Sequence, residues 1–382
     1  MFLNKIELKN FRNYESLNLD FNSNKILLIG KNAQGKTNLL EAVFYLSNLS
    51  SLRAKTDSEL IKWGKDFTVI KANIKKGDFD IDSEVVINPP KKKLLKINGI
   101  KKNKSSEFIQ NLLTVSFSTS DLLLLRGTPD DRRNWLDTAI SQIYPAYMDR
   151  LSKYNKIRIQ KNNYLKEIKG NTFIGSQLLD VWNEQMSITG SNIIFLRLKF
   201  LKEIIKIAQE KHSQISASET LTLTYNSSLV GDFEVVKDEL PAIETICTKF
   251  SEKLEEKKQE EIIRGQSIIG PHRDDLSYFI NDVDSKKFAS QGQQRTIVLA
   301  LKLAELDLIK NKTGENAVLL LDDVLAELDD LRQNYLLSAI GNEIQTIITS
   351  VDTLHFDEKY LKEVEVFKIS ASENNTKIES GI

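Results

Sequence analysis

The sequence predicts an α/β fold in which a mixed β-sheet is interrupted, along the chain, by a mostly helical insertion. An apolar run at 26–29 leads into a glycine-containing loop, as expected for a strand buried on both faces. A second apolar run at 317–321 precedes two aspartates. Between these strands, residues 130–215 repeat apolar side chains at helical spacing. We expect an α/β head that is split in sequence and formed by residues 1–120 and 265–382. The inserted, mostly helical lobe is expected at 121–264.

Strand periodicity dominates the first part of the head. Apolar and polar residues alternate over 2–21, and a helical pattern follows the loop at 37–46. Further short strands are expected at 68–74 and 83–87. Within 94–101, Asn-Gly stands between two arms that contain apolar residues, which is the strongest short signal of a β-hairpin.

From about residue 121 the spacing becomes helical. A second helical stretch is expected at 243–263, and its run of mixed charges is interpreted as a solvated helix face. Strands and helices alternate again after residue 267. The sequence contains no sustained heptad repeat, so a long coiled coil is not expected. The expected elements of this last part are a helix at 293–308, a strand at 317–321, a helix from 330 and a strand at 346–349.

Composition bounds the class of protein. Lys and Arg (53) balance Asp and Glu (53), so net charge does not indicate a nucleic-acid partner, although a local basic face is compatible with it. A lone cysteine, Cys247, is consistent with a reducing compartment. No apolar run approaches the roughly 20 residues that a membrane span needs, and the first residues carry charges where a signal peptide is apolar. We therefore expect a cytoplasmic protein without membrane contact.

A phosphate-binding loop is predicted between the first buried strand and its helix. The pattern is Gly, four residues, then Gly-Lys-Thr, whose backbone N–H groups and helix N-terminus surround an anion. Lys36 would reach the β- and γ-phosphates, and the Thr37 hydroxyl would bind Mg²⁺. The expected phosphate-binding residues are Gly30, Lys31, Asn32, Ala33, Gln34, Gly35, Lys36 and Thr37.

The loop requires a carboxylate for its metal ion, and the strand at 317–321 leads to two candidates. Asp322 would hold Mg²⁺, whereas Asp323 would orient or deprotonate an attacking water. Thr37 and Asp322 lie 285 positions apart, much further than in small P-loop kinases and GTPases. The spacing therefore favours a nucleotide site assembled across a large insertion.

The segment Ser290-Gln291-Gly292-Gln293-Gln294-Arg295 resembles the signature motif of ABC-type ATPases, and 326–329 resembles their D-loop. The order of loop, signature, acidic strand and D-loop also matches that family. The resemblance implies an ABC-type ATPase head that uses ATP and Mg²⁺. It also implies that Ser290, Gly292 and the adjoining Gln293 contact the nucleotide bound by the opposite subunit of an ATP-dependent homodimer.

Within this class the sequence is similar to the RecF family of recombination mediators. The segments that carry the similarity are 10–14, 124–129, 132–137 and 270–276. Three positions depart from general ABC proteins: Gln291 replaces glycine, Asp323 replaces glutamate, and Thr349-Ser350 replaces the histidine after the last strand. Since aspartate is the shorter acid, Asp323 and Lys36 are expected to support only slow ATP hydrolysis, used as a conformational switch.

The RecF-like resemblance further implies binding to duplex DNA near single-strand gaps and to single-stranded DNA. It implies partnership with RecR, with RecO and RecA downstream, in recombinational repair of DNA damage, DNA replication restart and the SOS response. Two alternatives from other classes remain at this point. One is a small-molecule P-loop kinase whose insertion is an acceptor domain, and the other is the ATPase subunit of a membrane transporter.

Basic residues crowd around the expected hairpin, and a second group is interleaved with tyrosine and asparagine in the helical insertion at 153–166. Either group is a solvated surface or a set of phosphate contacts, and the family resemblance favours contacts to DNA backbone. No base-reading pattern is present. The expected DNA-contacting residues are Lys91, Lys92, Lys93, Lys101, Lys102, Arg132 and Arg133, of which the two arginines are also candidates for the nucleotide.

Overall fold

The computed structural model describes residues 1–169, 177–353, 356, 358–372 and 375–380. Its internal contacts divide the chain into two compact units. The first unit consists of Met1–Asp121 and Glu305–Ile382, and the second of Leu122–Ala304. The chain passes from the second unit back to the first within one helix, α10 (Gln291–Thr313).

A six-stranded mixed sheet forms one layer of the first unit. Its order is β16-β15-β3-β14-β13-β8, with β15, β3, β14, β13 and β8 parallel and β16 antiparallel at the edge. The apolar residues of the central strands are buried, as expected for strands covered on both faces. The strand bounds are β3 Lys25–Ile29, β8 Thr114–Ser118, β13 Val318–Asp322, β14 Thr346–Ser350, β15 Glu365–Ser372 and β16 Asn375–Ser380.

An antiparallel sheet of order β2-β1-β4-β5-β6-β7 forms a second layer. The predicted hairpin is confirmed, because Ile97 pairs with Ile100 across a turn in which Asn98 and Gly99 have positive φ of 50° and 76°. The strand bounds are β1 Phe2–Phe11, β2 Tyr14–Asp20, β4 Thr68–Lys76, β5 Phe79–Ile87, β6 Leu94–Ile97 and β7 Ile100–Lys102.

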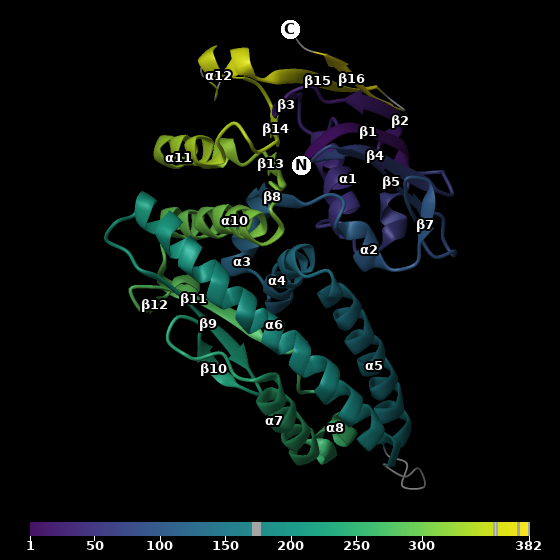
Figure 1. Ribbon diagram of the computed structural model, residues 1–382, viewed down its shortest axis with the longest axis vertical. Helices are drawn as coiled ribbons and strands as arrows, with labels where there is room; N and C mark the ends of the chain where they lie inside the picture. The colour runs from purple at the N-terminus through teal and green to yellow at the C-terminus, as the bar shows by residue number, and fades with distance from the viewer. Residues whose placement is uncertain (170–176, 354–355, 357, 373–374, 381–382) are drawn as a thin grey trace. The chain divides into compact units, whose positions relative to one another are not determined.

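Helix α1 (Lys36–Asn48) lies between these two sheets and contacts strands of both (Figure 1). Leu39, Ala42, Val43 and Tyr45 are fully buried, which is typical of a helix that packs on more than one side. The position of α1 fixes the loop that precedes it. The remaining helices of this unit are η1 Asp57–Leu60, α2 Ser105–Ile109, η3 Leu325–Glu327, α11 Asp330–Ile340 and α12 Glu358–Glu363, with η2 Thr119–Leu122 at its boundary.

The second unit combines helices with a small antiparallel sheet of order β10-β9-β11-β12. Helices α5 and α6 run side by side (Figure 1). The helix bounds are α3 Leu123–Arg126, α4 Pro129–Ile143, α5 Ala146–Ile168, α6 Gln177–Ile215, α7 Ile243–Glu256, α8 Lys258–Arg264 and α9 Ser285–Phe288. The strand bounds are β9 Leu221–Ser227, β10 Gly231–Glu234, β11 Asp275–Ile280 and β12 Val283–Asp284.

Two expectations for this unit need correction. Residues 265–304 were assigned to the head, but β11 pairs with β9 from Asp275–Asn226 to Ile280–Leu221 and so belongs to the second unit. We therefore move the second boundary from 265 to 305. The helix expected at 243–263 is divided at Lys257 into α7 and α8. Strand pairing across a long separation has no local sequence signal, which explains the misplaced boundary.

A buried charge network connects two of the RecF-like segments, 132–137 and 270–276. The guanidinium of Arg197 on α6 donates to Asp137 Oδ1 at 2.8 Å and to the carbonyl of Pro271 at 2.6 Å. Tyr225 donates to Asp274 Oδ2 at 2.5 Å, and burial raises the pKa of Asp274 to about 6. These segments therefore hold α4, α6 and the small sheet together.

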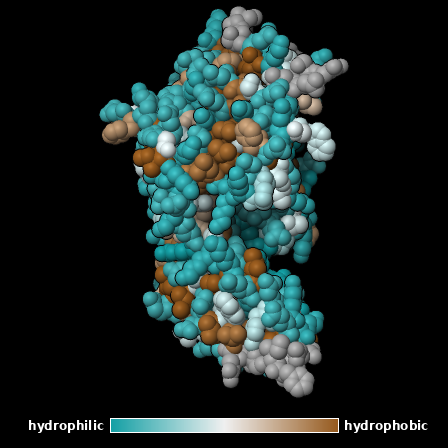
Figure 2. All heavy atoms as spheres, turned by 90° about the vertical axis from the view of Figure 1, so that its right-hand side faces the viewer, coloured by the Kyte–Doolittle hydropathy of each residue, from teal (hydrophilic) through white to brown (hydrophobic). Residues whose placement is uncertain are grey.

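Figure 2 shows that hydrophilic side chains cover most of the visible face, with hydrophobic ones in small groups among them. Within the described ranges, no helix is both long enough and apolar enough to cross a membrane.

We predict that Arg197→Met lowers the free energy of unfolding by about 3–5 kcal/mol, because the Asp137 carboxylate loses its charged partner and a buried carbonyl loses its donor. Urea unfolding followed by circular dichroism measures this change. Arg264→Met is the control, since Arg264 forms an ion pair at the surface and its loss should cost less than about 1 kcal/mol. Equal losses in the two variants would contradict the role given to the buried network.

Candidate phosphate-binding site

The loop at 30–37 connects the end of β3 to the first turn of α1, as the sequence predicts. Ala33 and Gly35 both have left-handed backbone, with φ of 64° and 113°. Turns of this kind at a helix N-terminus make a concave loop of N–H groups that suits an anion. The predicted strand–loop–helix arrangement is therefore present.

Glycine is required at the two positions of the loop for different structural reasons. A Cβ on Gly30 would lie 2.3 Å from the carbonyl oxygen of Ile369 on β15, so only glycine allows this close approach. Gly35 requires glycine for its positive φ, and a Cβ there would lie 2.7 Å from Asn13 Nδ2. Gly30 therefore fixes the loop against the sheet, and Gly35 permits the turn into α1.

Lys36 is 4% exposed and lies along the inside of the loop. Its Nζ donates to the carbonyls of Gly30 at 2.7 Å and Lys31 at 3.3 Å. An ammonium group in this position adds a positive charge to the ring of N–H donors. The loop thus has the charge that a polyphosphate requires.

Thr37 and Asp322 meet although they are 285 positions apart. Thr37 Oγ1 donates to Asp322 Oδ1 at 2.9 Å, and Thr349 Oγ1 donates to the same oxygen at 2.8 Å. The parallel pairing of β13 with β14 places Thr349 directly beside Asp322. Burial raises the pKa of Asp322, whereas the two hydroxyl donors act against that shift by stabilising the carboxylate.

This oxygen pair fits Mg²⁺ in the way the sequence predicts. One hydroxyl and one carboxylate are the usual protein ligands of a magnesium ion that also binds phosphates and water. In the part of the chain that the structure describes, no cluster of three or more His, Cys, Asp or Glu side chains forms a separate metal cage. Thr37 and Asp322 are therefore the residues that would hold the ion.

Asp323 follows the end of β13 in left-handed backbone, with φ of 51°. Its N–H donates to Thr349 Oγ1 at 2.9 Å, so one threonine orients both aspartates. Asp323 lines a cavity of about 410 Å³ together with the loop and Arg53. The second acid therefore faces the place where a bound phosphate would lie, and its unusual backbone is characteristic of functional sites.

Ser290, Gly292 and Gln293 belong to the second unit, at the start of α10. The backbone N–H of Ser290 donates to Gln293 Oε1 at 2.8 Å, and the N–H of Gln293 donates to Ser290 Oγ at 3.2 Å. This reciprocal pair caps the helix N-terminus. The residues predicted for the opposite side of the nucleotide thus belong to the second unit, whereas the loop at 30–37 belongs to the first.

Comparison with known proteins identifies the family. Residues 2–377 match the description "RecF/RecN/SMC N terminal domain". The DNA replication and repair protein RecF of Bacillus pumilus (strain SAFR-032) is 40% identical over 97% of this chain and 99% of its own length. That of Bacillus velezensis (strain DSM 23117 / BGSC 10A6 / LMG 26770 / FZB42) is also 40% identical, over 98% of this chain and 99% of its own length. The chain belongs to the RecF family.

Solved structures agree with this assignment. A structure described as the recombination mediator protein RecF with ATP, in the RecFOR pathway, is 33% identical with a TM-score of 0.88 and covers 99% of this chain and 98% of its own. An Smc head bound to a domain of ScpA is 15% identical with a TM-score of 0.53, over 100% of this chain and 98% of that one. The latter likeness concerns the fold alone, which is that of an ABC-type ATPase head.

Several residues of this RecF-family site were not assigned from the sequence. Asn13 Nδ2 donates to the carbonyl of Gln34 at 3.3 Å, and Tyr14 donates to that of Gly35 at 3.0 Å. Arg53 lines the cavity and donates to Asn38 Oδ1 at 3.0 Å. The RecF-like segment at 10–14 was a signal for the first two, but sequence alone assigned it no role. No local sequence pattern indicates that Arg53 belongs to the site.

The basic residues expected to contact DNA differ in their exposure to solvent and in their hydrogen-bond partners. Lys91, Lys92 and Lys101 are exposed, and Lys102 is half-buried. Lys93 instead donates to the carbonyl of Leu49 at 2.8 Å and forms an ion pair with Asp57 at 3.1 Å, so it fastens the hairpin region to the end of α1.

The two arginines need a firmer correction. Only 4% of the Arg132 side chain is exposed, and it forms a two-pronged ion pair with Asp275 at 2.6 and 2.9 Å. Arg133 is 15% exposed and donates to the carbonyl of Asp274 at 2.6 Å and to Asp130 at 2.6 Å. Their charges are used within the second unit, so we remove Arg132 from the DNA-contacting set and give Arg133 no priority in it.

Thr349→Val should raise the pKa of Asp322 further, because it removes a hydrogen bond that favours the carboxylate. Since Mg²⁺ binds only the ionised acid, the affinity of the variant for magnesium nucleotide should be weaker. As the pH is lowered, the variant should lose this binding at a higher pH than the wild type does. Loss of a hydrogen bond to a charged group corresponds to about 1.5–3 kcal/mol. Titration of a fluorescent ATP analogue at several pH values measures the effect.

The matched control is Thr346→Val on the same strand, because the Thr346 hydroxyl donates to the carbonyl of Ile344 and not to Asp322. If both variants bind magnesium nucleotide like the wild type at every pH, Thr349 has no part in tuning the metal-binding acid.

Proposed function

We propose that this chain is an ATP-gated DNA-binding protein of recombinational repair, active as an ATP-dependent homodimer. The observation that carries the proposal is the meeting of Thr37 and Asp322 beside the phosphate loop, since it completes a magnesium–triphosphate site from distant parts of the chain. Membership of the RecF family and likeness to a RecF structure described with ATP support this reading over the kinase alternative. We keep Mg²⁺ as its cofactor and the cytoplasm as its compartment.

In this proposal the loop residues bind the phosphates through their N–H groups, and Lys36 neutralises the β- and γ-phosphates. A magnesium ion held by Thr37 and Asp322 would supply further positive charge to the triphosphate. Asp323 orients the attacking water and accepts its proton. Arg53, at the edge of the same cavity, adds a cation near the phosphates. Because the aspartate side chain is short, hydrolysis is slow and serves to end the bound state.

The second part of the site is the N-terminus of α10. Ser290 and Gly292 stand where a long helix presents its positive end, a favourable place for the γ-phosphate held by a second copy. Gln293 holds the cap together through its hydrogen bonds to Ser290 and to Glu219 Oε1, the latter at 2.8 Å. ATP would therefore act as a component of the dimer interface, and its hydrolysis would remove the link between two copies.

The DNA partner is proposed to be duplex near single-strand gaps, together with single-stranded DNA itself. Relatives named for DNA replication and repair, and a RecF structure assigned to the RecFOR pathway, support this choice. We further propose that the chain acts with RecR and RecO to load RecA, and so contributes to replication restart and the SOS response. The exposed lysines of the β6–β7 region are its first candidate contacts with phosphate groups.

We predict that Ser290→Arg binds ATP but stays monomeric, because a large cation at the start of α10 displaces the cap and blocks the approach of a second copy's nucleotide. Light scattering with magnesium-ATP should show the wild type doubling in mass and the variant unchanged. Lys36→Ala is the companion variant, and it should lose nucleotide binding itself.

Ser251→Arg is the charge-matched control, because Ser251 is exposed on α7, which packs against α6 and lies well away from α10 in Figure 1. A Ser290→Arg protein that dimerises with ATP like the wild type would refute the shared-nucleotide interface. Unchanged ATP affinity in Lys36→Ala would refute the phosphate loop.

Reversing the exposed lysines Lys91 and Lys92 to glutamate should weaken DNA binding and reduce its dependence on salt, because fewer counterions are then released. Fluorescence anisotropy with a gapped duplex at several salt concentrations measures both quantities. The control is Lys310→Glu with Lys377→Glu, an equal change of charge at exposed sites outside the hairpin. If the two double variants show the same salt dependence, the hairpin is an ordinary solvated surface.

A further inference from the structure

Trp63 is 98% exposed, more than any other large hydrophobic side chain among the described residues. It lies on the turn between η1 and β4, followed by Gly64 with a φ of 77°. Indole combines a large apolar surface with a polar N–H group, and tryptophan is enriched at contact surfaces for this reason. The turn at 61–66, called here the Trp63 turn, is therefore a candidate contact surface.

The Trp63 turn is held firmly by backbone hydrogen bonds. The N–H of Lys62 donates to the carbonyl of Asn10 at 2.8 Å, and the N–H of Lys65 donates to that of Lys62 at 3.0 Å. Lys62 Nζ also donates to the carbonyl of Asn13 at 2.8 Å. A side chain displayed on an ordered turn loses little conformational entropy when it binds, which favours its use as an anchor.

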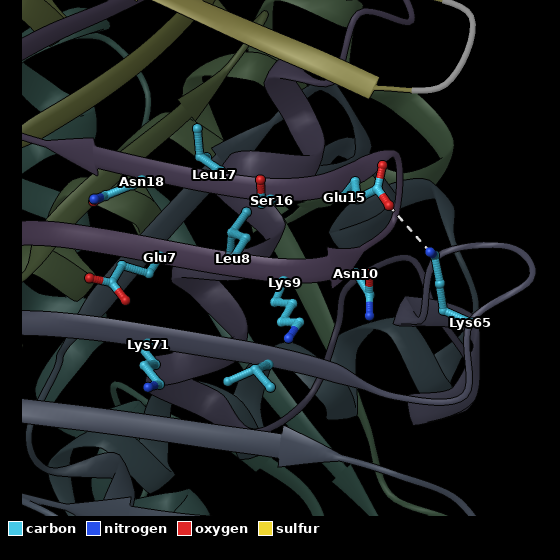
Figure 3. A pocket seen from close by; sticks show the side chains of 11 residues that line it. Glu7, Leu8, Lys9, Asn10, Glu15, Ser16, Leu17, Asn18, Lys65 and Lys71 are labelled. Carbon is cyan, nitrogen blue, oxygen red and sulfur yellow. Dashed lines mark hydrogen bonds and ion pairs between the residues drawn. The ribbon is translucent and has the colours of Figure 1, made fainter.

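A groove of about 590 Å³, which Lys65 helps to line, adjoins this turn (Figure 3). Figure 3 shows Lys9 on β1 and Lys71 on β4 in the groove, and Lys65 paired with Glu15 at 3.2 Å. Three lysines and two glutamates line it, so its charge is positive on balance. Polar and apolar side chains complete the lining: Asn10, Ser16, Asn18, Leu8, Leu17 and Val69. The ammonium groups of such a groove can pair with the phosphates of a single nucleic-acid strand.

We propose that Trp63 stacks on an unpaired base of single-stranded DNA whose backbone follows the lysine-lined groove. Aromatic side chains beside a basic groove are the general means of binding single strands without reading their sequence. Aromatic anchors of protein interfaces instead lie at the centre of buried, apolar patches. The other residues of the turn are mostly polar, which favours the nucleic acid: Ile61, Lys62, Gly64, Lys65 and Asp66. This inference rests on the proposed function and names a residue for its single-strand contact.

The turn is also connected to the phosphate loop through the segment at 10–14. Arg12 donates its backbone N–H to Leu60 at 2.8 Å, and its guanidinium pairs with Glu41 of α1 at 2.6 Å. Asn13 accepts from Lys62 through its carbonyl and donates through its amide to Gln34. One short segment therefore touches both sites. Binding of a strand at Trp63 would consequently alter nucleotide affinity, and nucleotide would alter strand affinity by the same factor.

The test compares Trp63→Ala, Trp63→Phe and the wild type in binding a fluorescent oligothymidine and a blunt duplex, with magnesium-ATP present. Trp63→Ala should weaken single-strand binding by at least about fivefold, because one base stack is lost, while duplex binding should change by less than about twofold. Trp63→Phe should restore most of the affinity. Phe79→Ala is the matched control, since Phe79 is 75% exposed at the first position of β5 and its loss should have no effect.

Single-strand affinity that is equal in Trp63→Ala and the wild type, or reduced equally in Phe79→Ala, would overturn the stacking proposal. A wild type that binds no DNA with any nucleotide would instead refute the proposed function. For the connection, Lys62→Met should still bind the oligonucleotide but no longer show its effect on nucleotide affinity. An effect of full size in Lys62→Met, or none in the wild type, would overturn the coupling.

Discussion

The function of this chain depends on the parallel pairing of β3, β14 and β13. This register places Thr349 beside Asp322 and lets Thr37, at the start of α1, reach the same carboxylate oxygen. Parallel strands deliver their carboxyl ends to one edge of the sheet, so residues far apart in sequence converge there. Burial destabilises the ionised form of Asp322, and hydrogen bonds from two hydroxyl groups stabilise it. The site is thus prepared for a cation by its own hydrogen bonds.

The segment at 10–14 is a second organising feature of the head. It touches the phosphate loop through Asn13 and Tyr14, α1 through Arg12, and the Trp63 turn through backbone bonds. A glycine at position 35 is required partly because Asn13 lies so close to it. Residues that determine the shape of the loop therefore come from outside the loop. The same segment would transmit the proposed coupling between the Trp63 turn and the nucleotide site.

In the second unit, residues of the RecF-like segments form contacts that stabilise the fold, and these contacts use the charges that we expected to bind DNA. Arg132 and Arg133 looked like phosphate-binding residues, yet they bind Asp275 and the carbonyl of Asp274. Arg197, which no pattern singled out, lies at the centre of the buried network. A charge removed from water needs a partner, and several segments of this unit meet to supply partners. Basic residues read from a sequence therefore have to be tested against burial before they are assigned to DNA.

The sequence by itself determined the buried strands, the hairpin at Asn98-Gly99, the phosphate loop and the pair Asp322-Asp323, because each follows from local periodicity or from a short pattern. The tertiary structure decided the rest. The unit boundary at 305, the orienting role of Thr349, the cation Arg53 in the cavity and the exposure of Trp63 all depend on which distant segments pack together. Pairing partners and solvent exposure are properties of the folded chain, and no local run of residues encodes them.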